Sequence, residues 1–417
     1  MNLTKTKFKN AALCTHCGYC LPVCPTYRAE NEESLSPRGR VSIVLALAKG
    51  ELTPKQSSAA LAFCLVCRAC HAACPVGVRP AKLVLSARNL SPVPPSRFTR
   101  LLHAITNHHG LTSLAAGAIR FYQKRGIQRW VRRWKLLYLL PPLNRLERLI
   151  PVHRQEPIPA FPPPHQPPAP LRAALLCGCM ARLFHPRVAP SAANLLHFSG
   201  IDVTEMAGFG CCGAPFRERG ERQPFIQQAK KTLDAYRKAG KVDIILCDTS
   251  VCQITVRSYG RVLRADKEYA ALAQEFCEKI DNLESFLAKN LLKMVPSGYQ
   301  PEKSCLTFQD HCQVRHGMDI LEPPRVLIQN LAGPLRELPR GDRCCGAGGD
   351  YQLHHPDLSH KIREDKLDAI AESQAQTVVG TNSGCLLNIE GGLEEREMDV
   401  SVRHLAEVLW KPLSQLK

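Results

Sequence analysis

The apolar positions change their spacing along the chain, and these changes predict where helices and strands lie. Stretches of helix-forming residues with mixed apolar and polar positions predict helices at residues 38–49, 224–238 and 357–371. Short apolar or β-branched runs predict buried strands at residues 173–176, 243–246 and 306–309. Because short strands alternate with helices after residue 170, that part of the chain is predicted to form α/β units around small parallel sheets.

One stretch, residues 120–140, combines an apolar face with a strong positive charge. The apolar face follows helical spacing at Ile127, Trp130, Val131, Trp134, Leu137 and Tyr138. Basic residues occupy much of the remaining surface, at Lys124, Arg125, Arg129, Arg132, Arg133 and Lys135. Three interpretations stay open: peripheral contact with a membrane, a docking helix for an acidic partner, and an internal helix with a solvated basic face. No nucleic-acid-binding motif accompanies the charge, so no nucleic-acid partner is expected.

The composition is that of a folded protein with more than one domain. The chain has 417 residues, of which 45% are apolar and 22% charged, and these figures exclude disorder, collagen and a long coiled coil. The net charge is +18, and residues 97–154 hold 12 Lys or Arg against one acid, Glu147. The N-terminus is polar and Lys-rich, and no apolar run approaches the roughly 18 residues of a membrane span. We therefore expect a cytoplasmic protein whose thiols are reduced.

Eight of the 20 cysteines form two runs near the N-terminus, and both runs read C-x2-C-x2-C-x3-C-P. In reduced surroundings such clusters are metal ligands. In this spacing three thiolates bind one [4Fe–4S] cluster and the fourth binds the other cluster. One cluster is thus assigned to Cys14, Cys17, Cys20 and Cys74, and the other to Cys64, Cys67, Cys70 and Cys24. The alternative is a pair of structural zinc sites, which seldom use this spacing.

The second half of the chain repeats itself. Cys179, Cys211, Cys212 and Cys252 recur as Cys312, Cys344, Cys345 and Cys385, each shifted by 133 positions. Adjacent cysteines are poor core pairs because neighbouring side chains diverge, so the two sets are predicted to be metal or redox sites at strand ends. Each set is expected to converge in one small pocket. No counterpart in the other copy exists for Cys177, Cys247, Cys277 and Cys305, and these thiols are expected to be inert.

At the cysteine pairs the chain resembles a known family. The strings Cys211-Cys212-Gly213-Ala214-Pro215 and Cys344-Cys345-Gly346-Ala347-Gly348-Gly349 are similar to the cysteine-rich CCG domain. This domain occurs twice in heterodisulfide-reductase-type subunits and in iron–sulfur subunits of flavin-linked hydroxyacid dehydrogenases. Stretches such as Cys24-Pro25-Thr26-Tyr27 and Thr381-Asn382-Ser383-Gly384-Cys385 look closest to the glycolate oxidase (glycolate dehydrogenase) iron–sulfur subunits.

The motifs and the resemblance together predict an α+β multidomain protein, in which a helical two-cluster ferredoxin domain precedes two repeated small α/β CCG domains. The expected divisions are the ferredoxin domain at residues 1–95, a basic amphipathic helical segment at 96–150, a linker at 151–170 with nine prolines, and CCG domains at 171–295 and 296–417. Gly208, Gly210 and Gly213 spell G-x-G-x-x-G, but the cysteine pair inside this string argues against a dinucleotide loop.

The resemblance implies an electron carrier that is not itself catalytic. A partner flavoprotein would oxidise glycolate to glyoxylate, and this chain, peripheral to the inner membrane, would pass the electrons towards quinone. It also implies a further iron–sulfur centre in one or both CCG domains. The reductases end each CCG unit with C-x-x-C, whereas here four residues separate Cys247 from Cys252 and Cys385 stands alone. A full cluster, a labile cluster and a thiol pair therefore stay open.

Three other functions stay open beside the electron carrier for glycolate. One is the corresponding subunit of a lactate or glycerol-3-phosphate dehydrogenase. Another is a heterodisulfide-reductase-like enzyme in which the cysteine pairs reduce a substrate disulfide. The third, from a different class, is a zinc-stapled nucleic-acid binder, which metal analysis would separate from the others.

Overall fold

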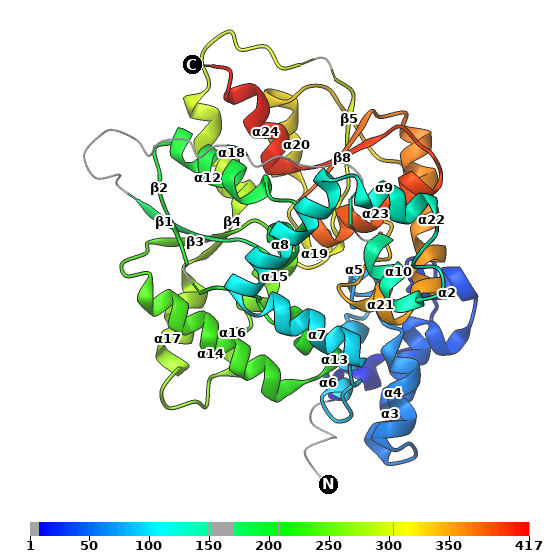
Figure 1. The fold of residues 1–417 in the computed structure, drawn as a ribbon. Coiled ribbons are helices and arrows are strands. Elements are labelled where there is room, and N and C mark those ends of the chain that lie inside the picture. The colour runs from blue at the N-terminus through cyan, green and yellow to red at the C-terminus, as the bar shows by residue number, and fades with distance from the viewer. Residues whose placement is uncertain are drawn as a thin grey trace.

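The computed structural model describes residues 8–148, 150, 151, 158, 171–206, 208–302 and 304–416. The N-terminal helices lie at one corner of the molecule, and two α/β parts form the rest (Figure 1). The proline-rich linker predicted at residues 151–170 falls outside the described residues, apart from residues 151 and 158.

The first part of the chain is helical. Its elements are η1 (Lys9–Leu13), α2 (Pro25–Glu30), η2 (Glu33–Leu35), α3 (Pro37–Lys49), α4 (Pro54–Ala62), α5 (Ala69–Ala72) and α6 (Pro80–Arg88). The helix α3, predicted at 38–49, begins after Ser36, whose hydroxyl accepts a hydrogen bond from the amide of Gly39, and ends at Gly50 in the left-handed conformation. Apolar residues of α3, α4 and α6 form a small core, against which Cys14, Cys64 and Cys74 pack.

The basic segment forms α7 (Arg97–Thr106), α8 (His109–Lys124), α9 (Ile127–Arg133) and α10 (Pro141–Arg148). The prediction of one helical face over residues 127–138 is wrong, because α9 ends at Arg133 and Lys135 has a φ of +49°. Tertiary contacts override the helical spacing here. Arg132 binds Glu147 of α10 at 2.9 Å and the carbonyl of Ile150 at 2.8 Å, so the chain turns back soon after α9.

Each α/β part is built on a four-stranded parallel sheet, as predicted. The first has the order β2-β1-β3-β4, with β1 (Arg172–Leu176), β2 (Asp202–Glu205), β3 (Ile244–Cys247) and β4 (Ile280–Asn282). The second has the order β6-β5-β7-β8, with β5 (Leu306–Phe308), β6 (Leu335–Arg336), β7 (Thr377–Gly380) and β8 (Ser401–His404). The strands thus occupy matching places in the two sheets, which confirms that the sequence repeat is a repeat of fold.

Helices cover both sheets in matching positions. The first part contains α11 (Cys179–Phe184), α12 (Val188–Phe198), α13 (Ala214–Arg219), α14 (Arg222–Lys238), α15 (Ser250–Val256), α16 (Tyr259–Val262), α17 (Ala270–Glu278), α18 (Leu283–Asn290) and η3 (Leu291–Met294). The second contains α19 (Cys312–Arg315), α20 (Glu322–Leu331), α21 (Tyr351–His354), α22 (Pro356–Ser373), α23 (Ser383–Glu395) and α24 (Leu405–Leu413). The predicted helices at 224–238 and 357–371 lie within α14 and α22. The constant offset ends after α15 and α23, because α16 and α17 are present only in the first part.

The two α/β parts pack against each other reciprocally. Helix α12 of the first part contacts α24 of the second, and the equivalent pair, α20 of the second and α18 of the first, makes the matching contact. These four helices share one buried core with residues of both sheets, such as Leu175 and Phe308. The arrangement resembles an isologous dimer made within one chain, so the same face of each part is turned towards the other. None of the helices that the structure describes is long and apolar enough to cross a bilayer.

Candidate functional site

The first predicted set, Cys14, Cys17, Cys20 and Cys74, lines a single pocket close to the surface. Cys17 is exposed, and the neighbouring Tyr19 has 69% of its surface exposed. The set joins three cysteines of the first run with the last cysteine of the second, and the loops that carry them leave η1 and α5. We call this set the outer set.

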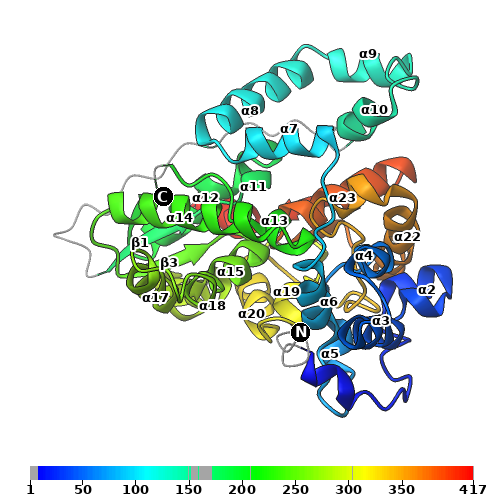
Figure 2. The same cartoon turned by 90° about the horizontal axis from the view of Figure 1, so that it is seen from below.

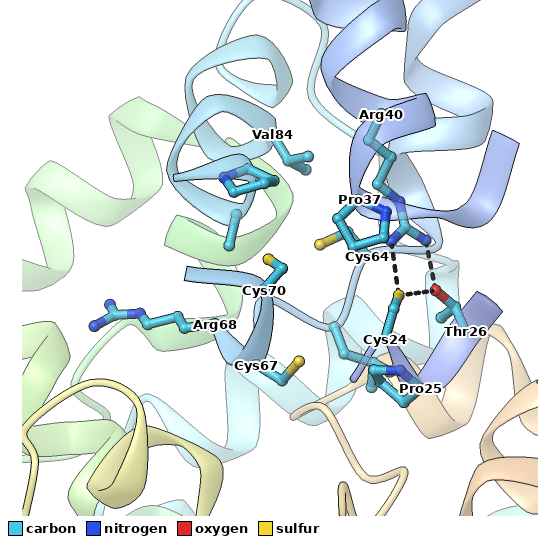
Figure 3. Close-up of a pocket in the computed structure, with 13 residues that line it drawn as sticks. Cys24, Pro25, Thr26, Pro37, Arg40, Cys64, Cys67, Arg68, Cys70 and Val84 are labelled. Atoms are coloured by element: carbon cyan, nitrogen blue, oxygen red, sulfur yellow. Dashed lines mark hydrogen bonds between the residues drawn. The ribbon is translucent and has the colours of Figure 1, made fainter. Parts of the chain in front are cut away.

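The second predicted set, Cys24, Cys64, Cys67 and Cys70, lines a neighbouring pocket between α3 and α6. Figure 3 shows the four side chains arranged around a common space, with Pro37 and Val84 closing it. Cys24 and Cys70 are buried, and burial raises the pKa of the Cys67 and Cys70 thiols well above its usual value. We call this set the inner set. The structure brings each set together in the crossed combination, and the role of these thiols as ligands stays a prediction.

Hydrogen-bond donors point at the sulfurs of both sets. The amide of Val66 lies 3.4 Å from Cys64 Sγ, and the amide of Val78 lies 3.2 Å from Cys74 Sγ. Arg40 donates to Thr26 Oγ1 at 2.9 Å and reaches Cys24 Sγ at 3.8 Å (Figure 3). Such donors stabilise thiolates and tune the potential of an iron–sulfur cluster. Among the described residues no three His, Cys, Asp or Glu side chains lie close enough to hold a single metal ion.

A second buried arginine places positive charge beside the inner set. Arg88 is 5% exposed and donates to the carbonyl oxygens of Leu61 at 2.6 Å, Cys64 at 2.7 Å and Glu218 at 2.6 Å. A cluster held by four thiolates carries net negative charge, and a buried guanidinium with satisfied donors offsets that charge. The chemistry of the donors therefore fits a [4Fe–4S] cluster in this pocket.

The first repeated set forms a continuous row of sulfurs. Cys211 lies in contact with Cys179 and with Cys212, and Cys212 lies in contact with Cys252. Cys179 begins α11 and Cys252 lies in the first turn of α15, so each helix start follows the end of a strand. The amide of Gly213 donates to Cys211 Sγ at 3.4 Å, and its φ of +79° is what lets the chain turn directly after the pair.

The second repeated set matches the first closely. Cys345 contacts both Cys344 and Cys385, and Cys312 lies beside Cys344 and Cys345. Gly346 has a φ of +80°, and its amide donates to Cys344 Sγ at 3.5 Å. A Cβ at this position would stand 2.5 Å from the carbonyl oxygen of Ser359, so only glycine fits. Gly346 thus turns the chain after the second cysteine pair, as Gly213, the last glycine of the G-x-G-x-x-G string, does after the first.

The four cysteines of each set lie together, as predicted, and the two sets share their pocket. All eight repeated cysteines line one cavity of about 140 Å³ between the two α/β parts. The reciprocal packing explains this. Helix α15, which carries Cys252, packs on α19, which carries Cys312, and the equivalent pair α23 and α11 brings Cys385 and Cys179 together. The sequence repeat predicts two equal sites but contains no signal for the way in which the copies face each other.

Buried polar groups line the same cavity. Within the described residues, Thr249 Oγ1, Gln313 Oε1 and Gln352 Oε1 are buried without a hydrogen-bond partner. His311 is buried and caps α19: its Nδ1 accepts from the amide of Gln313 at 3.3 Å. Burial raises the pKa of Glu218 to about 7. The cavity can thus hold a polar or charged group, and the repeated thiols are its densest set of soft ligands.

The four cysteine sets follow one another through the molecule. Cys70 lines the pockets of both the outer and the inner set. Leu65 lines the inner pocket and the large cavity, and Cys67 lies beside Cys344. The order in space is therefore the outer set, the inner set, the Cys312 set and the Cys179 set. Two of the thiols without a repeat partner have other surroundings: Cys247 is buried in the core cluster that also contains Cys212 and Cys252, and Cys277 accepts from the amide of Gly260 at 3.3 Å.

Three known family models match successive parts of the chain. The model of a 4Fe-4S dicluster domain matches residues 10–78, and that of a cysteine-rich domain matches residues 173–257 and 306–390. A model described as the linker region of the glycolate oxidase iron–sulfur subunit matches residues 96–150. The chain therefore carries a two-cluster [4Fe–4S] domain and two cysteine-rich domains, as the motifs predict.

Curated relatives extend over nearly the whole chain. A "Probable glycolate oxidase iron-sulfur subunit" of Bacillus subtilis (strain 168) is 30% identical over 95% of this chain and 92% of the relative. The "Glycolate oxidase iron-sulfur subunit" of Escherichia coli (strain K12) is 26% identical over 96% and 94% of the two chains. The shorter "Lactate utilization protein A" of Bacillus cytotoxicus is 27% identical over 57% of this chain and 98% of the relative.

Proposed function

The chain belongs to the family of glycolate oxidase iron–sulfur subunits, and on that premise we propose that it carries electrons from a flavin-containing glycolate dehydrogenase subunit towards quinone at the inner membrane. As in its relatives, the subunit serves an oxidoreductase complex and is not itself catalytic. The oxidation of glycolate to glyoxylate removes two electrons as a hydride equivalent, whereas iron–sulfur clusters carry single electrons. A flavin can accept two electrons from the substrate and pass them on one at a time, and this flavin must be supplied by a partner.

The observation that carries this proposal is the row of four cysteine sets. Neighbouring sets share lining residues, and the outer set, with the exposed Cys17, stands at one end of the row. In this chain the inner and outer pockets would hold two [4Fe–4S] clusters, which move one electron at a time. Arg40 and Arg88 would offset the negative charge of the inner cluster, and the amides at Val66 and Val78 would set the strength of the thiolate donors.

Rapid reduction of the clusters by substrate tests the proposal. The complex, purified anaerobically with its flavoprotein subunits, is mixed with glycolate, and cluster reduction is followed by electron paramagnetic resonance. We expect reduced [4Fe–4S] signals within the turnover time, and none when the chain is present without its flavoprotein. Signals that never appear with glycolate, although dithionite reduces the clusters, would refute glycolate as the electron source.

A second candidate is an electron carrier for lactate oxidation. The observation that favours it is the similarity to lactate utilization protein A, which extends over almost the whole length of that shorter protein. The same experiment separates the two candidates when lactate replaces glycolate. Reduction of the clusters by lactate alone would assign the chain to the second function.

A further inference from the structure

We infer that helices α7 to α10 form the surface by which this chain binds an anionic membrane. The inference deepens the proposed function, since an electron carrier that delivers to quinone has to reach the bilayer. Figure 2 shows α8, α9 and α10 along one side of the molecule, projecting from the rest of the fold. The argument rests on the exposed apolar side chains of this segment, on how they are held, and on its charge.

Exposed apolar side chains are concentrated in this segment. Of the eighteen large apolar side chains that are exposed among the described residues, twelve belong to it. They are Leu101, Leu111, Leu114, Phe121, Ile127, Trp130, Trp134, Leu136, Tyr138, Leu139, Leu140 and Leu143. Scattered exposed apolar residues are normal for a soluble protein, but a concentration in one segment marks a surface that binds another apolar surface.

Helix α8 is apolar on two opposite faces. One face, with Ala115, Ala116 and Ile119, packs on Leu183 and Phe184 of the first cysteine-rich domain. The other face carries Leu114, which is 72% exposed, and Phe121, seven positions further on, which is 56% exposed. Residues seven apart share a helix face, so the outer face is a continuous stripe. A helix that served only to cover the core would need the first face alone.

The segment after α8 is fixed so that its aromatic residues point outwards. Gln128 is 3% exposed and donates to the carbonyl oxygen of Ile150 at 3.0 Å. Arg132 holds Glu147 at 2.9 Å and Glu394 of the second cysteine-rich domain at 2.6 Å. With these two polar side chains turned inwards, Trp130 is 57% and Trp134 64% exposed. The usual pattern of a surface helix, with apolar side chains inside and polar ones outside, is reversed here.

The charge of the segment indicates that its binding partner is an anionic bilayer. Residues 97–154 carry 12 basic residues, and their one acid, Glu147, is buried against Arg132. The exposed cations Lys124, Arg125 and Arg129 stand beside the exposed aromatics, and the guanidinium of Arg125 lies over the Phe121 ring at 5.4 Å. Interleaved basic and aromatic side chains suit the interface of an anionic bilayer, where phosphates meet acyl chains. The surface spreads over four helices, as contact with a flat bilayer requires.

Vesicle binding by the full cluster-loaded chain tests the inference without any electron transfer. Flotation with phosphatidylglycerol-containing vesicles and with pure phosphatidylcholine vesicles gives the two affinities. We expect binding to the anionic vesicles to be at least about tenfold tighter, since each basic residue near the surface contributes separately. Binding should weaken strongly at about 1 M salt, where the screening length is about 3 Å.

Two variants and a matched control locate the surface. The pair Trp130→Ser and Trp134→Ser removes exposed rings, and the pair Arg125→Glu and Arg129→Glu reverses charge; each should weaken vesicle binding about tenfold or more. The control pair Lys293→Glu and Met294→Ser makes the same kinds of change at exposed positions outside the segment. It should bind like the unaltered chain. Circular dichroism and cluster absorbance check that every variant is folded.

Several results would overturn the inference. One is that the unaltered chain does not bind anionic vesicles. Another is that the tryptophan and arginine variants bind these vesicles as tightly as the control does. If the variants bound vesicles normally but no longer co-purified with the flavoprotein, the surface would be a protein interface instead. Concentration-dependent dimers abolished by the variants would identify a second copy as the occupant. None of these results depends on glycolate, so failure here and failure of the proposed function are distinguishable.

Discussion

The two cysteine-rich domains have the same strand order and matching cysteines, yet they meet different neighbours. The second domain borders the inner set: Leu65 packs with Tyr351 and Ile362, and Gln313 donates to the carbonyl oxygen of Val66 at 3.1 Å. The first domain borders α8 and reaches the ferredoxin part chiefly through α13. The repeat has kept the cysteines and the strand order, and the contacts of the two domains with the rest of the chain differ. Equal folds thus occupy unequal places relative to the ferredoxin part.

A buried charge distinguishes the surroundings of the two cysteine sets. Lys366 of α22 is fully buried, donates to the carbonyl of Gly341 at 3.2 Å and lies beside Cys344 and Cys345. The corresponding position in α14 is Leu233, also fully buried. A buried ammonium costs free energy unless negative charge stands near it. The second set therefore has a buried ammonium beside its cysteine pair, whereas the cations near the first set are the guanidinium groups of Arg182 and Arg217.

The largest expected effect comes from the cysteines that the domains share. Cys212→Ser and Cys345→Ser should each abolish the centre predicted for their own domain. The loss of metal affinity should exceed the roughly 10–100-fold that follows when a residue hydrogen-bonded to a metal ligand is mutated. Cys247→Ala should be mild, because its counterpart is Gly380 and its thiol lies in the sheet core. Metal analysis and cluster spectra measure the outcome. Equal damage by all three substitutions would remove the basis for treating the domains as two copies of one site.

The second largest effect is expected at the ion pair that Arg219 and Asp350 form between the two domains. Arg219 of the first domain is 5% exposed and binds Asp350 of the second, while its other amino group lies 3.2 Å from His103 Nδ1. Arg219→Met should lower the free energy of unfolding by about 3 kcal/mol, because the buried Asp350 would lose its guanidinium partner and keep only His103 and His354 beside it. Adding Asp350→Leu should recover much of the loss. Denaturant titration measures both, and a mild single variant would mean that the Arg219–Asp350 pair contributes little to holding the domains together.

Lys366→Leu would make the second domain resemble the first. Removing the countercharge should lower the reduction potential of the centre held by the Cys312 set by about 60 mV or more, the one-electron equivalent of a roughly tenfold change in equilibrium. A redox titration followed by electron paramagnetic resonance checks this. The control Lys361→Leu lies on the same helix but is exposed, and it should leave the potential unchanged. An unchanged potential in both variants would mean that Lys366 has no electrostatic role at the centre.

The smallest expected difference lies at the helix starts that carry the last cysteine of each set. Asn382 Oδ1 accepts from the amides of Gly384 at 2.9 Å and Cys385 at 3.3 Å, whereas Thr249, its counterpart, makes no such cap. Asn382→Ala should therefore cost about 1 kcal/mol of stability, and Thr249→Ala should cost less. Thermal unfolding of the two variants compares them directly. A larger loss at Thr249 would show that its hydroxyl has another task in the cavity.

The local elements of this structure could be predicted from the sequence, but the way in which they pack against one another could not. The spacing of the two N-terminal runs and the offset of the repeat predict which cysteines lie together, because ligand spacing and strand ends are local features. The shared cavity depends on contacts such as that of α15 with α19, which join surfaces far apart in the chain. The break after Arg133 also came from distant partners, Glu147 and Ile150. Lys366 could have been noticed, since a lysine among apolar helix positions is a signal in itself.

The crossed arrangement of the N-terminal cysteines has a consequence for how the protein matures. Each pocket is lined by three predicted ligands from one run and a fourth from the other, so neither predicted ligand set is complete until residues near Cys24 and Cys74 have come together. If these thiols bind the clusters, delivery of iron and sulfide would not finish on a nascent chain that ends before the second run. Because cluster binding and folding are coupled, oxidative loss of one cluster should also loosen the loop that completes the other. The domain would then be assembled, and lost, as a single unit.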